Sequence, residues 1–172
     1  MGRKSNSSTA SAANKASANS ELAIKVLAQF REVFRAAKLH FAAVQRNAGV
    51  SGAQLWALWE LHEQPGLRVS ELTHKMSLHQ STVSNLVDKL SGAGLVRRMR
   101  ESTDRRAVRL QLTSAGRKVI ARAPKPARGV LPDALTKLEK RELVKMYGSL
   151  ETLIKKMKVR APGASKTHLE NI

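Results

Sequence analysis

The sequence predicts a mainly α-helical fold with one small β-hairpin wing, in which a winged helix-turn-helix is flanked by long helices. Three observations predict it. Apolar residues recur at three- and four-residue spacing over most of the chain, which is typical of amphipathic helices. After residue 94 the apolar period changes to two, which indicates strands. Two short predicted helices, separated by a tight turn, come directly before this change.

A long amphipathic helix is expected at residues 21–47, ending before Gly49. Its apolar positions are Val26, Phe30, Val33, Phe34, Ala37, Phe41 and Val44. Nothing from Gly2 to Ser20 is larger and more apolar than Ala, so residues 1–20 are expected to be a disordered basic tail. Such a tail could contact phosphate or simply remain solvated.

The winged helix-turn-helix is expected at residues 51–116, and this segment is called the reading head below. Ser51 with Gln54 forms the pattern of a capping box, which predicts the start of a second helix. Ser70 is the expected N-cap of a short third helix. A fourth helix, at residues 80–92, carries its apolar positions on one face, at Val83, Leu86, Val87 and Leu90.

Two strands are expected on either side of residues 101–105, since Val108, Leu110 and Leu112 alternate with polar residues. Thr113 is the expected cap of a fifth helix, which Pro124 interrupts. A last helix is expected at residues 133–158. The domain prediction is therefore one domain at 21–158, with dimerisation helices at 21–50 and 117–158, followed by a polar tail at 159–172.

The charge balance indicates a polyanionic partner. Lys and Arg number 31 against 13 Asp and Glu, for a formal charge of +18. No apolar run is long enough for a membrane span, so double-stranded DNA is favoured over a membrane and a cytoplasmic location is expected. The chain has no cysteine, and its histidines lack metal-ligand spacing. No enzyme, metal or cofactor motif occurs, so we expect a non-enzymatic protein without metal or cofactor.

The polar face of the fourth predicted helix carries side chains suited to reading bases. Short donors and acceptors can contact base edges in a major groove, and Lys89 lies where the helix would meet phosphate. An ordinary solvated face would have a similar composition. The candidate DNA contacts on this helix are Gln80, Ser81, Thr82, Ser84, Asn85 and Lys89.

The predicted hairpin is rich in arginine, which favours an anionic partner over a solvated turn. Asp104 precedes Arg106 by two residues, so its carboxylate could hold that guanidinium and direct it into a narrow minor groove. Arg105 could serve in place of Arg106. The candidate DNA contacts on the wing are Arg98, Arg100, Asp104, Arg105 and Arg106.

These motifs resemble, in order and spacing, those of the MarR (multiple antibiotic resistance regulator) family. The matching stretches are Val-Ser-Glu-Leu at 69–72, Gln-Ser-Thr-Val-Ser-Asn-Leu-Val-Asp-Lys-Leu at 80–90, Gly-Leu-Val-Arg-Arg at 94–98, Asp-Arg-Arg-Ala at 104–107 and Leu-Thr-Ser-Ala-Gly at 112–116. The resemblance implies a homodimer on a palindromic operator, often released by a small aromatic or anionic effector. The long apolar stripes of the flanking helices also favour a dimer, although they could instead pack on each other within one chain.

The chain departs from the family pattern at three places. His79 stands where Asp or Ser often caps the recognition helix, so pH could modulate this cap. Asn85 stands where many members have Arg, which favours adenine over guanine as the base read. Pro124 and Pro126 shorten the fifth helix. The absence of cysteine excludes thiol-based peroxide sensing.

His40, Trp56, Trp59 and His62 are candidate effector contacts, although aromatic residues at helical spacing also suit a core. The first hypothesis is a dimeric, sequence-specific DNA-binding regulator of transcription that acts as a ligand-responsive repressor. The alternative is a non-specific architectural DNA-binding protein of the nucleoid type, which the charge also permits. A small-molecule-binding protein or enzyme without DNA is the third.

Overall fold

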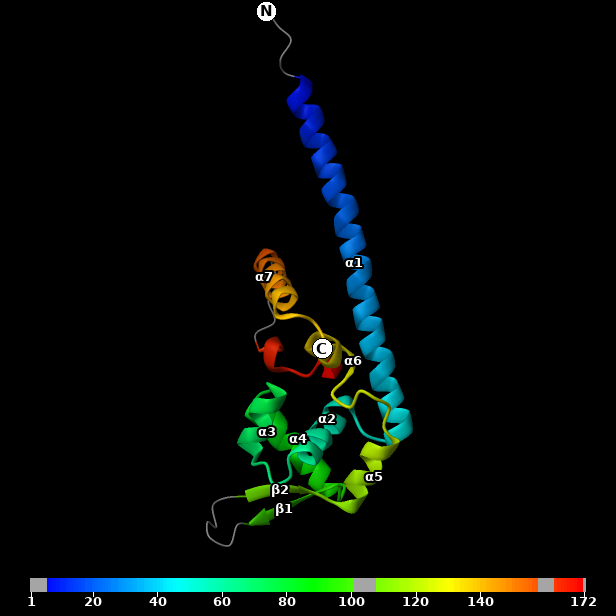
Figure 1. Ribbon diagram of the computed structural model, residues 1–172, viewed down its shortest axis with the longest axis vertical. Coiled ribbons are helices and arrows are strands. Elements are labelled where there is room, and N and C mark those ends of the chain that lie inside the picture. Colours follow the sequence, from blue (N-terminus) through cyan, green and yellow to red (C-terminus); the bar gives the residue numbers. More distant parts are fainter. Residues whose placement is uncertain (1–5, 101–107, 158–162, 172) are drawn as a thin grey trace, which may run out of the picture. The chain divides into compact units, whose positions relative to one another are not determined.

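The computed structural model describes residues 6–100, 108–157 and 163–171. These residues form seven α-helices, a two-stranded sheet and two 3₁₀ turns (Figure 1). The chain divides into two compact units, Met1–Ala36 and Ala37–Ile172. A mainly helical fold with one antiparallel hairpin confirms the predicted fold class. No helix within the described ranges is both long and apolar enough to cross a membrane.

Helix α1 runs over Asn6–Ala48 and therefore begins much earlier than expected. Residues 6–20, predicted to belong to a disordered tail, are helical in the structure; the first five residues lie outside the described part. Residues 6–48 contain no glycine or proline and many alanines, so nothing in the sequence interrupts the helix. The helix ends at Gly49, whose positive φ of 69° is a conformation that favours glycine.

Helix α2 (Gly52–Glu63) lies at the centre of the larger unit and contacts four other elements, α3 (Val69–Met76), α4 (Gln80–Gly92), α5 (Ser114–Arg122) and β2 (Val108–Leu112). The predicted capping box is confirmed: the backbone N–H of Ser51 donates to Gln54 Oε1 at 2.8 Å, and that of Gln54 donates to Ser51 Oγ at 3.3 Å. Leu55, Leu58 and Leu61 are fully buried along this helix. Their burial makes α2 the support against which these four elements pack.

Helices α3 (Val69–Met76) and α4 (Gln80–Gly92) form the helix-turn-helix. The predicted apolar stripe of α4 is buried in full, at Val83, Leu86, Val87 and Leu90. The predicted N-cap of α3 was wrong, because Arg68 holds that position and Ser70 lies in the first turn. The backbone N–H of Arg68 donates to Glu71 Oε2 at 2.6 Å, which fixes the earlier start.

Strands β1 (Val96–Arg100) and β2 (Val108–Leu112) pair antiparallel, with Val96 opposite Leu112. Leu110 and Leu112 are buried, as their alternation predicts. The backbone of Leu110 also bonds to the α2–α3 connection, donating to Leu67 O at 2.9 Å and accepting from Gly66 N at 3.1 Å. The hairpin is thus fixed to the helix-turn-helix on its second edge.

Helix α5 (Ser114–Arg122) begins as predicted, since the backbone N–H of Gly116 donates to Thr113 Oγ1 at 3.0 Å. The single last helix predicted at 133–158 was wrong. The structure has α6 (Val130–Thr136) and α7 (Lys140–Lys156) instead. Glu139 is extended and its N–H donates to Glu142 Oε2 at 3.1 Å, which caps α7 and separates it from α6.

The segment at 163–171 contains the 3₁₀ turns η1 (Ala164–Lys166) and η2 (Leu169–Asn171). It belongs to the expected polar tail at 159–172, but His168 within it is only 5% exposed. One buried imidazole in a polar sequence leaves no periodic signal, so the sequence did not indicate this burial.

Candidate nucleic-acid interface

Helix α4 presents the predicted base-reading residues on the side opposite the core. Gln80, Ser81, Asn85 and Lys89 are exposed, while Thr82 and Ser84 are half-buried at the edges of the face. The core-facing stripe holds the helix in place and leaves this polar face open. The structure therefore brings all six predicted α4 residues together on one surface of suitable chemistry for base edges and phosphate.

The turn before α4 sets the angle between the two helices. Ser77 adopts a left-handed conformation with φ of 51° and ends α3, and its N–H donates to His74 O at 3.2 Å. Leu78 is buried. His79 is the N-cap of α4, but its side chain makes no capping hydrogen bond to any described residue. The backbone N–H of His79 donates to Lys166 O at 3.2 Å, so a distant segment satisfies this donor.

The wing stands beside the helix-turn-helix, with β1 in contact with α4 and β2 in contact with α3 (Figure 1). Arg98 and Arg100 are exposed on β1. Asp104, Arg105 and Arg106 lie outside the described residues, so their predicted geometry is not described. Strands β1 and β2 lead to the segment that holds them.

An ion pair that the sequence analysis missed joins the wing to the recognition helix. Arg98 Nη2 lies 2.7 Å from Asp88 Oδ1, and both side chains are partly exposed. Arg98 is therefore held against α4 and its charge is partly offset. The signal in the sequence was Asp88 on the polar face of a helix that otherwise suits DNA, since an acid at a phosphate surface needs a basic partner.

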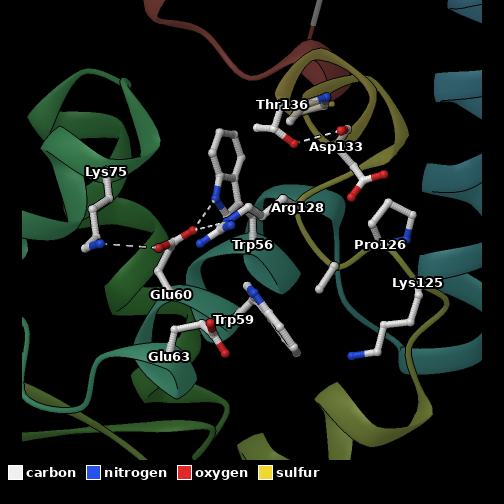
Figure 2. Close-up of a pocket in the computed structure, with 12 residues that line it drawn as sticks. Trp56, Trp59, Glu60, Glu63, Lys75, Lys125, Pro126, Arg128, Asp133 and Thr136 are labelled. Atoms are coloured by element: carbon white, nitrogen blue, oxygen red, sulfur yellow. Dashed lines mark hydrogen bonds and ion pairs between the residues drawn. The ribbon is translucent and has the colours of Figure 1, made fainter. Parts of the chain in front are cut away.

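A pocket of about 580 Å³ opens near α2 and contains two of the four predicted effector contacts, Trp56 and Trp59. Their neighbours in its wall come from α3 and from the chain after α5, and include the cations Lys75, Lys125 and Arg128 (Figure 2). Lys125 Nζ lies 4.1 Å from the centroid of the Trp59 ring. Aromatic surface and several cations thus line the same cavity.

Glu60, which the sequence analysis also missed, forms the polar centre of this pocket and is 2% exposed. Its Oε1 accepts from Trp56 Nε1 at 2.9 Å and from Arg128 Nε at 2.6 Å, and Lys75 Nζ lies 3.8 Å from Oε2 (Figure 2). The bond to Glu60 raises the pKa of Arg128. One carboxylate therefore connects α2, α3 and the segment after α5. Its position four residues after Trp56 was the available signal.

The other two predicted effector contacts do not line this pocket. His62 packs beside Trp59, with ring centroids 5.5 Å apart. His40 is buried, and its Nε2 has no hydrogen-bond partner among the described residues. Burial lowers the pKa of His40, against the opposing effect of a hydrogen bond to the backbone of Pro126.

These features define a winged helix-turn-helix of the kind that binds DNA, and comparisons with known proteins find similar sequences and structures among transcriptional regulators. Residues 50–108 match the model of the MarR family. The transcriptional repressor MdtR of Bacillus subtilis is 37% identical over 68 residues, which cover 40% of this chain and 44% of MdtR. The uncharacterised regulator YsmB of the same organism is 28% identical over 127 residues, covering 69% of this chain and 87% of YsmB.

Solved structures agree. A MepR-like protein superposes with a TM-score of 0.54 at 25% identity, covering 76% of this chain and 94% of that one. A MarR family protein from Bacillus stearothermophilus superposes with a TM-score of 0.50 at 26% identity, covering 81% and 98%. Residues 50–108, most of the reading head, are therefore similar to the MarR family, and solved structures of similar regulators share the fold described here.

Proposed function

We propose that the chain is a homodimeric repressor that reads a palindromic operator and releases it when a small aromatic or anionic effector binds. The observation that carries the DNA-reading part is the polar face of α4, exposed opposite a fully buried stripe and flanked by a basic wing. Its relative MdtR is named a transcriptional repressor, which supports the sign of regulation proposed for this chain.

Within this proposal Asn85 reads a base and Lys89 binds phosphate. An asparagine side chain can make a two-point contact with adenine in the major groove, whereas a lysine one turn later meets the backbone. Arg106 enters the minor groove in the same proposal, held by Asp104. The support for that contact is the arginine-rich sequence of the wing.

Exposed apolar side chains support the dimer. On α1, Leu22, Ile24, Leu27 and Phe34 are at least half exposed. On α7, Tyr147, Leu150 and Ile154 are exposed, and so is Met157 at its C-cap. Stripes of large apolar residues are uncommon on the surface of a monomer and are typical of an interface. A two-fold dimer would present two copies of α4 at about 34 Å, one turn of DNA.

The pocket around Trp56 and Trp59 supports an effector site. An aromatic acid could stack on indole and place its carboxylate near Lys75, Lys125 or Arg128. Such a ligand would compete with Glu60 for its cationic partners. Because Lys75 lies on the first helix of the helix-turn-helix, this competition would reach the DNA-binding unit.

The test is selection of bound duplexes from a random pool, first with the full chain and then with Asn85→Ala. We expect a palindromic motif for the full chain. In the variant we expect a relaxed base preference at one position in each half-site. We also expect the binding free energy for DNA to weaken by about 1 to 3 kcal/mol. An unchanged motif in Asn85→Ala would refute the assignment of this residue.

The charge of +18 favours one alternative function, a non-specific architectural DNA-binding protein. The two functions differ in competition experiments at moderate salt. An unrelated duplex that competes as well as the selected one would support the architectural function, whereas a competitor weaker by about a thousandfold would support the regulator.

A further inference from the structure

The segment at 163–171 folds back onto the reading head and buries a histidine there. The ring of His168 lies 5.4 Å from Phe41 and 6.0 Å from Trp56, measured between centroids. Its Nδ1 accepts a hydrogen bond from the backbone N–H of Glu170 at 3.3 Å. The buried His168 side chain therefore holds the middle of the segment against Phe41 and Trp56.

Two further contacts join this segment to α4, the helix that would face DNA, and to α2, which supports it. The carbonyl oxygen of Lys166 accepts from the N–H of His79, the N-cap of α4. The carboxylate of Glu170 accepts from the N–H of Ala53 at 3.3 Å, in the first turn of α2. The segment therefore touches the beginnings of two different helices.

The carboxylate of Glu170 also borders the recognition surface. It lines a hollow of about 410 Å³ together with Thr82, Asn85 and Lys89, three of the six candidate DNA contacts on α4. A DNA backbone that approached this edge of α4 would meet a carboxylate, and like charges repel. The chain after Gly163 would also occupy space next to His79, where the helix would enter a groove.

We propose that residues 163–171 form an inhibitory strap that competes with DNA for the edge of the recognition helix. The strap rests on the proposed function of α4, because only a helix that faces DNA can be blocked in this way. DNA binding displaces the strap, and a strap that is held in place weakens binding. In the free protein this edge of α4 is thus occupied by a segment of the same chain, which His168 anchors and which carries a negative charge at Glu170.

The first test compares two variants that each remove one negative charge. Glu170→Gln removes the strap's carboxylate, while Glu151→Gln removes an exposed one on α7 that pairs with Lys155 at 2.8 Å. Affinity is measured by fluorescence anisotropy on a duplex of scrambled sequence at low salt. We expect Glu170→Gln to bind about two- to fivefold tighter than Glu151→Gln. Equal affinities would overturn the strap.

The second test follows the segment itself by hydrogen exchange, with and without the same duplex. We expect faster exchange of the amides at 163–171 in the complex, and unchanged or slower exchange would overturn displacement. Lys89→Ala separates the two proposals. If Lys89→Ala weakens binding but Glu170→Gln behaves as Glu151→Gln does, only the strap fails, whereas unchanged binding by Lys89→Ala contradicts the DNA surface itself.

Discussion

Arg128 Nε donates a 2.6 Å hydrogen bond to Oε1 of Glu60, a carboxylate buried in the centre of the reading head. The two residues are 68 positions apart in the chain. Their pairing attaches the segment after α5 to α2, and Lys75 brings α3 to the same carboxylate. The buried charge is satisfied only when all three elements are in place, so the pair couples the pocket to the helix-turn-helix.

Arg128→Met should destabilise the protein by about 1 to 3 kcal/mol, because Glu60 then loses its shortest charged hydrogen bond while remaining buried. The free energy of unfolding is measured in urea at fixed protein concentration. Lys137→Met is the matched control, since Lys137 pairs with Asp133 at the surface and should contribute under about 1 kcal/mol. Equal losses in the two variants would contradict the role given to Glu60.

Gly52→Ala should also destabilise the protein, by about 1 to 3 kcal/mol. A Cβ atom there would lie 2.6 Å from Cδ1 of Phe41, so the ring would have to move. Gly148→Ala in α7 meets nothing within 4 Å and should stabilise the helix by about 0.5 to 1 kcal/mol. Thermal unfolding measures the change in stability of both variants. An unchanged stability of Gly52→Ala would show that Phe41 repacks without cost.

Asp88→Ala should tighten DNA binding and increase its salt dependence. The change removes an acid from α4 and releases Arg98, which lies 2.7 Å from it in the free protein. If Arg98 then meets one more phosphate, the slope of log K against log salt steepens by about 0.9. Binding isotherms at several salt concentrations measure this slope. A slope equal to that of the unchanged protein would mean that Arg98 contacts no phosphate.

Acid should loosen the strap through His168. Burial lowers the pKa of His168 from its usual 6.5, against the opposing charge of Glu170, whose Oε2 lies 3.9 Å away; Arg128 lines the same cavity. The folded state therefore binds fewer protons than the unfolded state. Stability from this group is full above pH 6.5 and is lost as the pH falls from there toward the lowered pKa.

The check is the difference in unfolding free energy between the natural chain and His168→Gln, followed from pH 7.5 to pH 5. As the pH falls, the natural chain should lose stability relative to the variant. The reason is that His168, unlike Gln, can gain a proton on Nδ1, which breaks the hydrogen bond that Nδ1 accepts from Glu170 N. Other histidines, such as His40, cancel in the comparison. A difference that does not vary with pH would contradict the assignment.

Ile154→Glu should convert a dimer to single chains. Ile154 is 55% exposed on α7, so a carboxylate there costs little in one chain but would be buried without a partner in an interface. Light scattering after gel filtration measures the mass. We expect twice the chain mass of 18.9 kDa for the natural protein and one chain for the variant. A natural protein that elutes as one chain would refute the dimer.

Residues 80–92 show how much of a helix a local sequence pattern can predict. The boundaries of α4, its buried stripe and its polar face follow from a period that repeats every turn, and the structure agrees with each. The caps at Ser51 and Thr113 were also predictable, because a cap joins residues three positions apart. Where an unusual residue caps, as Glu139 does before α7, the sequence offered no clear boundary.

The sequence by itself determined the reading head and its resemblance to the MarR family, because periodicity, caps and motif spacing are properties of neighbouring residues. Only the tertiary structure decided which charges meet. The pairs of Glu60 with Arg128 and Asp88 with Arg98, and the return of residues 163–171 to α2 and α4, join positions that no local period relates. Burial of the apolar stripes brings these elements together, and the polar contacts then depend on the packing that the stripes impose.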